Sequence, residues 1–303
     1  MIQKLMEYQK YLNPSIVSKI SSLELKAKYI VEGFIMGLHK SPFHGFSVEF
    51  AEHRQYMPGD EIKRIDWKIY GKTNKFYVKQ YEEETNLKCY IVLDSSASMG
   101  YCSNKKLPNK FEYALSLSAA FAYLMIKQQD AVGAGVYNNK LNSFLPAHSR
   151  LNYLSEIMKV LSDAKPSSGT MSSKALNLMA ERIKRRGLVI VISDFLDDIN
   201  ESISALKHFR HKQNEVIAIQ LLDPLEKSFN FDYNATFRDM ETGEQMVSQP
   251  SQIKNDYQIT INNFLKKFKK ECSNSGIDYL LIDTSTPFDT ALTEYISKRR
   301  KML

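Results

Sequence analysis

Tyr90-Ile-Val-Leu-Asp-Ser-Ser-Ala-Ser-Met-Gly100 is the stretch that decides the fold. Its first four residues show no polar alternation, as expected of a strand that is covered on both faces. Asp94, Ser96 and Ser98 follow at alternate positions, and a helical pattern starts near Asn109 after a polar loop. Ligands of parallel sheets bind at the loop that follows a strand. The stretch therefore predicts a central strand and a ligand-binding loop.

The pattern Asp-x-Ser-x-Ser offers one carboxylate and two hydroxyls from a single turn. Mg²⁺ and Mn²⁺ favour such hard oxygen ligands in octahedral geometry and usually retain some water. The alternative is a polar strand-to-helix turn whose serines cap the helix. The short motif leaves both interpretations open, and the metal site gains support if other loops supply further oxygens.

Composition and cysteine content bound the class of protein. The chain has 303 residues, which suffices for one large domain and a smaller one. It is 43% hydrophobic and 25% charged, as in ordinary globular proteins. No apolar run approaches the roughly 18 residues of a membrane span, and the first residues do not resemble a signal peptide. The three cysteines form no Cys-x-x-Cys pair, so we expect reduced thiols and a cytoplasmic location.

The net charge of +7 is concentrated in four basic segments, at residues 182–186, 207–212, 266–270 and 298–301. A basic surface can bind nucleic acid or an acidic protein. The alternative is that these segments are solvated helix faces. The sequence shows none of the common nucleic-acid-binding signatures.

Strands and helices alternate from Cys89 onward, which predicts an α/β fold with a mostly parallel sheet flanked by helices. We assign this main domain to residues 88–303. Further strands are expected at 130–136, 141–145, 187–194, 215–221 and 279–282, the first two of these as an antiparallel pair, and helices at 109–129, 149–163, around 261–272 and from 288. Residues 232–248 are expected to form a hairpin insert that turns at Glu241-Thr-Gly243.

Residues 1–87 are assigned to an amino-terminal appendage of helices and short strands. Asn13-Pro14 is typical of a helix start, and a second helix is expected from Leu23 to Gly37. Alternation predicts strands at 46–50 and 76–81. Between these strands we expect a short helix that is capped by Asp60 and carries Ile62, Ile65 and Trp67.

Two later loops supply the missing oxygens. Thr170 follows the turn at 166–169, and Asp194 ends the strand at 187–194. The series Asp94, Ser96, Ser98, Thr170 and Asp194 resembles the metal-ion-dependent adhesion site of von Willebrand factor A domains. The resemblance implies that the three hydroxyls bind a divalent cation directly or nearly so, and that the aspartates bind it directly or through water. It also implies that an acidic residue of a partner completes the metal shell.

The amino-terminal third contains the segments Gly37-Leu-His-Lys-Ser41, Arg54-Gln-Tyr56, Pro58-Gly-Asp60, Arg64-Ile-Asp-Trp67 and Val78-Lys-Gln-Tyr81. Together with Leu221 to Glu226 and the Glu241-Thr-Gly-Glu244 turn, these segments resemble the bacterial family known as domain of unknown function 58. The resemblance implies partnership with a MoxR-type AAA+ ATPase, in a chaperone-like or metal-insertion assembly.

The family motif contains several charged and aromatic residues, namely Arg54, Tyr56, Gly59, Asp60, Arg64, Asp66 and Trp67. One interpretation is structural, with Arg–carboxylate pairs that organise the appendage and Trp67 in its core. The other is a surface for a partner or substrate.

Two other functions remain as alternatives. A metal-dependent phosphatase with Asp94 as nucleophile requires a second acid two positions later, where this chain has Ser96, and Ser96 also lacks the glycines of a serine-hydrolase elbow. A nucleic-acid-binding protein would use the basic helices, and its affinity would fall steeply with salt. We expect instead a non-catalytic, Mg²⁺- or Mn²⁺-dependent protein-docking module.

Overall fold

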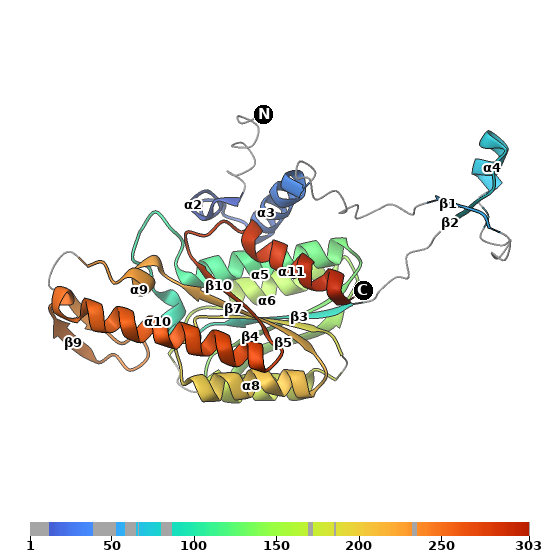
Figure 1. Ribbon diagram of the computed structural model, residues 1–303. Coiled ribbons are helices and arrows are strands. Elements are labelled where there is room, and N and C mark those ends of the chain that lie inside the picture. Colours follow the sequence, from blue (N-terminus) through green and yellow to red (C-terminus); the bar gives the residue numbers. More distant parts are fainter. Residues whose placement is uncertain are drawn as a thin grey trace.

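Figure 1 shows a computed structural model of the chain. The structure describes residues 12–38, 53–57, 65, 67–79, 87–168, 172–184, 186–231 and 235–302. Within these ranges, no helix combines the length and the apolar character that crossing a membrane requires.

A six-stranded sheet forms the centre of the main domain (Figure 1). Its strands are β3 (Lys88–Asp94), β4 (Ala131–Tyr137), β5 (Leu141–His148), β6 (Leu188–Ser193), β7 (Glu215–Leu222) and β10 (Asp278–Asp283). The order is β10-β7-β6-β3-β4-β5, and every pair is parallel except β4–β5. The predicted fold class and the predicted antiparallel pair are confirmed. β3 lies at the centre because its apolar residues are suited to burial on both faces.

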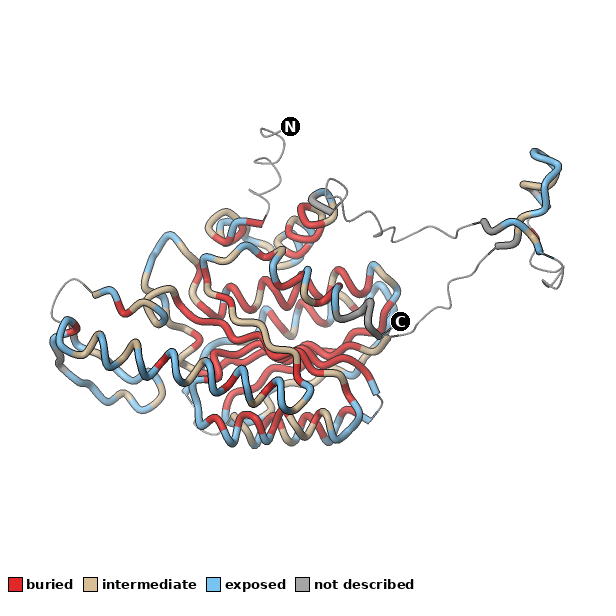
Figure 2. Tube along the Cα trace, in the orientation of Figure 1, coloured by how far each residue is buried: buried red, intermediate tan, exposed pale blue. Residues whose placement is uncertain are grey.

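Successive residues of β3 enter two separate cores, as the two-residue period of a strand requires. Ile91 and Leu93 pack in one hydrophobic cluster, and Tyr90 and Val92 pack in the other. The first cluster lies under α2 (Pro14–Val17), α3 (Leu23–Leu38), α5 (Lys110–Lys127), α6 (Tyr153–Asp163) and α11 (Asp289–Met302). The second lies under α7 (Ser172–Arg182), α8 (Ile199–His211) and α10 (Pro250–Asn274). Figure 2 shows the resulting buried layer along the sheet.

The helices α2 and α3 share the core of the main domain, although both lie within residues 1–87. Asn13 caps α2 by accepting a hydrogen bond from the Ser15 amide at 3.0 Å, as predicted. The buried face of α3 carries Ala27, Ile30, Val31 and Phe34, which belong to the same cluster as the apolar side chains of α5. The two helices α2 and α3 therefore complete one face of the sheet.

A small unit comprises β1 (His53–Gln55), α4 (Trp67–Thr73) and β2 (Tyr77–Lys79), with β1 antiparallel to β2. The rings of Tyr70 and Phe76 stack with centroids 4.4 Å apart. Trp67 begins α4 and is 57% exposed, so the structural interpretation is wrong where it places this side chain in the core. Among the aromatic side chains described, its ring contacts that of Tyr70, with the centroids 6.0 Å apart and the two planes nearly perpendicular. The strand expected at 46–50 and the predicted cap Asp60 lie outside the described residues.

The predicted hairpin insert is present as β8 (Ala235–Arg238) and β9 (Gln245–Ser248). The short helix α9 (Pro224–Ser228) precedes it and ends at Phe229. The ring of Phe229 stacks on Phe237 of β8 at 5.4 Å and on Tyr257 of α10 at 4.2 Å. These aromatic contacts anchor the hairpin to α10.

Candidate metal-binding site

The site begins where β3 ends, at Asp94, and continues into the 3₁₀ turn η2 (Ala97–Gly100). One carboxylate oxygen of Asp94 accepts a hydrogen bond from the Ser96 amide at 2.8 Å. The other accepts a hydrogen bond from Ser193 Oγ of β6 at 2.5 Å. Because both donors are neutral, hydrogen bonds hold Asp94 in place, and no ammonium or guanidinium group of the described residues pairs with it.

The hydroxyls of Ser96 and Ser98 lie on the same side of the turn, with their Oγ atoms 3.1 Å apart. Neighbouring oxygens in an octahedral Mg²⁺ shell, each about 2.1 Å from the ion, are about 3.0 Å apart. The separation of the two hydroxyls therefore suits adjacent positions around such an ion. The residues present fit a small divalent cation.

Asp194 follows the neighbouring strand β6, and its carboxylate contacts Lys110 of α5. Lys110 Nζ lies 2.8 Å from Asp194 Oδ2 and 2.6 Å from Glu226 Oε1, and its side chain is 0% exposed. The main-chain oxygen of Asp194 accepts a hydrogen bond from Gln220 Nε2 at 2.6 Å. Asp194 is thus fixed from two neighbouring elements, and its charge is balanced by a buried lysine.

The two aspartates influence each other because both are buried. Burial and then the charge of Asp194 raise the pKa of Asp94 from 3.8 to about 7. Burial by itself would lower the pKa of Lys110, but the charges of Asp194 and Glu226 raise it above its usual value. Lys110 is already paired with Asp194. A cation beside Asp94 would lower the free-energy cost of burying the Asp94 carboxylate in its charged form.

Four of the five predicted metal ligands are described. Asp94, Ser96 and Ser98 lie together at the end of β3, and Asp194 follows the adjacent strand β6. The fifth, Thr170, lies outside the described residues. Across the part of the chain that the structure describes, no group of three or more His, Cys, Asp or Glu side chains could hold a metal ion. The candidate site is therefore built from hydroxyls and two carboxylates.

The family-motif residues of the appendage are only partly described. The Tyr56 ring is half-buried, with its centroid 6.2 Å from that of Phe76. Arg54 pairs with Val78 through the β1–β2 ladder, and its side chain is not described. Gly59, Asp60, Arg64 and Asp66 lie outside the described residues, so the choice between a structural and a partner-facing role stays open for them.

Sequence reasoning missed Lys110, Ser193 and Glu226 as parts of this site. Lys110 carried a weak signal, because it directly follows the helix cap Asn109, where a cation faces the unfavourable end of the helix dipole. A lysine at that position suggests a local acidic partner. Nothing in the local sequence indicated that Ser193 contacts Asp94 or that Glu226 contacts Lys110.

A family model described as "Protein of unknown function DUF58" matches residues 52–263, which is more than half of the chain. The chain belongs to the DUF58 family. An uncharacterised protein of Mycobacterium tuberculosis is 25% identical over 302 residues, which covers 95% of this DUF58 chain and 91% of the relative.

Solved structures with a similar fold include BatB from Bacteroides thetaiotaomicron, with 22% identity and a TM-score of 0.49. That match covers 71% of this DUF58 chain and 99% of the BatB chain. The VWA domain of SpRpn10 has 12% identity and a TM-score of 0.39, and the match covers 70% of this chain and 95% of that domain.

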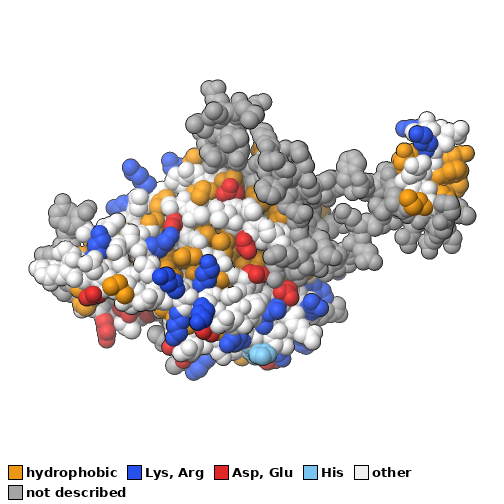
Figure 3. All heavy atoms as spheres, in the orientation of Figure 1, with side chains coloured by type: hydrophobic (Ala, Val, Ile, Leu, Met, Phe, Trp, Pro, Cys, Tyr) orange, Lys and Arg blue, Asp and Glu red, His pale blue; other side chains and the backbone are white. Residues whose placement is uncertain are grey.

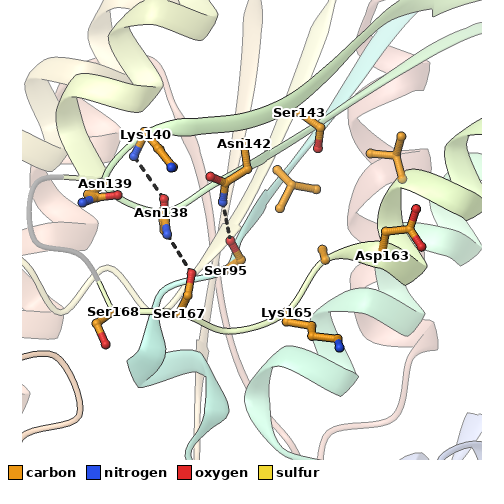
Figure 4. Close-up of a pocket in the computed structure, with 13 residues that line it drawn as sticks. Ser95, Asn138, Asn139, Lys140, Asn142, Ser143, Asp163, Lys165, Ser167 and Ser168 are labelled. Carbon is orange, nitrogen blue, oxygen red and sulfur yellow. Dashed lines mark hydrogen bonds between the residues drawn. The ribbon is translucent and has the colours of Figure 1, made fainter.

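A polar cavity of about 670 Å³ lies beside the candidate site of this DUF58 chain, between the β4–β5 turn and the end of α6 (Figure 4). Ser95 lines it, whereas Asp94, Ser96 and Ser98 do not. The Ser95 hydroxyl donates to the Tyr137 carbonyl at 2.8 Å and accepts from Asn142 Nδ2 at 3.3 Å. Alternate residues of the motif thus face different sides of the loop, and Ser95 serves to hold the loop.

Proposed function

We propose that this chain is a docking module that holds Mg²⁺ or Mn²⁺ at Asp94, Ser96 and Ser98, with Thr170 and Asp194 as further ligands. The bound ion would supply an electrophilic position for an acidic side chain of a partner. One observation carries the proposal: two hydroxyls 3.1 Å apart lie next to a buried carboxylate whose hydrogen-bond donors, among the described residues, are neutral. A divalent cation would both fit the hydroxyls and balance that carboxylate.

The residues of the site bind and orient, and we assign none of them to catalysis. Ser193 and the Ser96 amide hold Asp94, and Lys110 holds Asp194. From the family resemblance we propose that the partner is a MoxR-type AAA+ ATPase or a client of that ATPase, in a chaperone-like or metal-insertion assembly. The cytoplasmic location stays a prediction.

The basic surface supports nucleic-acid binding less well than the candidate site supports metal-dependent docking. In the segment 207–212, His208 and Lys212 contact Glu181, each at 2.8 Å, and Arg210 contacts Glu215 at 2.8 Å. Figure 3 shows acidic side chains among the Lys and Arg side chains on the face that carries α8 and α10. Pairing of this kind divides a basic surface into small areas, which suits a solvated helix face better than a continuous phosphate-binding track.

Calorimetric titration with Mn²⁺ and Mg²⁺ tests the proposal, with Asp94→Ala as the site variant and Asp256→Ala as the control. Asp256 is exposed on α10, so its substitution removes the same charge away from the site. We expect binding to the wild type and the control, and none to Asp94→Ala. Capture of a MoxR-type ATPase with and without EDTA then tests metal-dependent docking. Absence of metal binding to the wild type, even with the ATPase present, would refute the proposed function.

A further inference from the structure

The tip of the β8–β9 hairpin places a carboxylate at the candidate metal site. Glu241 Oε1 accepts a hydrogen bond from the main-chain amide of Ser98 at 3.0 Å. The two residues are 143 positions apart in the chain. An acidic side chain of this chain therefore contacts the turn that carries Ser96 and Ser98, two of the three predicted hydroxyl ligands.

Further contacts locate the hairpin tip over the same loops. A Cβ atom added to Gly100, at the end of η2, would lie 3.7 Å from Met240 Cε and 3.6 Å from Pro166 Cβ. Burial raises the pKa of Asp197, and the charges of Asp194 and then Glu241 raise it further. Asp197 lies in the loop after β6, so this loop is within electrostatic range of the Glu241 carboxylate.

The conformation of the tip is fixed by its own hydrogen bonds. Asp239 Oδ1 accepts from the Glu241 amide at 2.7 Å and from the Thr242 amide at 2.9 Å. The Asp239 amide donates to the Glu244 carbonyl at 2.8 Å, and Gly243 adopts a φ of +79°, which favours glycine. The turn thus presents Glu241 without further ordering of the backbone.

We propose that Glu241 is an acidic ligand that the chain itself supplies to the cation at Ser96 and Ser98, and that an acidic partner docks by displacing the hairpin tip. This inference rests on the proposed function, because it concerns the same metal site. Carboxylate oxygens are hard ligands that suit Mg²⁺ and Mn²⁺. Because the hairpin is tethered to the domain, its carboxylate acts at a high effective concentration, and a free acidic group competes poorly with it.

The substitution Glu241→Gln tests this role while keeping an oxygen that can accept from the Ser98 amide. Glu244→Gln is the matched control, since Glu244 lies exposed on the same hairpin and loses the same charge. We expect Mn²⁺ affinity, measured by calorimetry, to fall by about tenfold or more in Glu241→Gln and to stay unchanged in the control. Because Gln can still accept the hydrogen bond from the Ser98 amide, a loss of Mn²⁺ affinity in this variant would show that the Glu241 carboxylate binds the ion. A side chain that only supports the loop would give no such loss.

Displacement is measured on the Mn²⁺-loaded proteins by fluorescence anisotropy with a labelled pentapeptide that carries one central Glu. Its counterpart with a central Gln controls for contacts that do not involve a carboxylate. We expect the Glu peptide to bind Glu241→Gln more tightly than the wild type, by on the order of tenfold or more. The Glu244→Gln control should bind it as the wild type does.

The possible outcomes distinguish the two proposals. If the wild type binds Mn²⁺ and Glu241→Gln matches it in both measurements, Glu241 is a structural contact only and the inference is wrong, while the metal site stands. If Asp94→Ala binds Mn²⁺ as the wild type does, or the wild type binds none even with the ATPase present, both proposals are wrong.

Discussion

The substitution Lys110→Met removes the one positive charge that directly contacts Asp194 among the described residues. Lys110 is 0% exposed, and its ammonium lies 2.8 Å from Asp194 and 2.6 Å from Glu226. Methionine retains much of the length and apolar contact of lysine, so the change mainly leaves the buried Asp194 carboxylate and the half-buried Glu226 carboxylate without their cation. Breaking a buried ion pair in this way costs about 3–5 kcal/mol of unfolding free energy.

Urea denaturation followed by circular dichroism measures this cost. At an m-value of about 3 kcal/mol/M, the expected loss lowers the urea midpoint by about 1–1.7 M. Lys159→Met is the control, because Lys159 is exposed on α6 and its loss should change stability by no more than about 0.5 kcal/mol. Adding Glu226→Gln to Lys110→Met should recover part of the loss, since one unpaired carboxylate is then neutral. A midpoint for Lys110→Met equal to that of Lys159→Met would refute the reasoning.

Three further predictions concern pH, close packing and the basic surface. Because the pKa of Asp94 rises from 3.8 to about 7 on folding, the metal-free folded state retains a proton that the unfolded state loses, and stability falls as pH rises from about 4 to about 7. Urea midpoints measured in EDTA at pH 5 and 8 should show this fall in the wild type and a smaller fall in Asp94→Asn. An equal fall in the two proteins would contradict the prediction. Gly187→Ala should cost about 1–3 kcal/mol in the same assay, since its Cβ would lie 2.3 Å from the Lys88 carbonyl oxygen, whereas Gly71→Ala meets nothing within 4 Å and should be tolerated. Lys266→Glu with Lys267→Glu should leave any DNA affinity and its salt dependence unchanged in gel-shift assays, and a clear loss would favour the nucleic-acid alternative.

The parts of the site that could be predicted lie close together in the chain. Asp94, Ser96 and Ser98 fall within five residues after a buried strand, so their proximity is a property of one turn. Asp194 could be added because carboxyl ends of neighbouring parallel strands meet at one edge of a sheet. The helices and strands of the main domain follow likewise from apolar periodicity, which each segment carries by itself.

The position of Trp67 shows where such reasoning fails. One of the two interpretations of the family motif placed Trp67 in a core, but Trp67 is 57% exposed at the start of α4. Burial depends on which element covers a side chain, and the local sequence does not specify that neighbour. The same holds for α3, whose apolar face was predictable but whose packing on α5 was not.

The sequence by itself determined the α/β class, the central strand, the Asp-x-Ser-x-Ser turn and the presence of a hairpin at 232–248. Only the tertiary structure decided that Lys110 neutralises Asp194 and that Glu241 contacts Ser98. The partners in these contacts are 84 and 143 residues apart. Periodicity and turn chemistry act over a few residues, whereas such contacts arise from the packing of whole elements, which no single segment encodes.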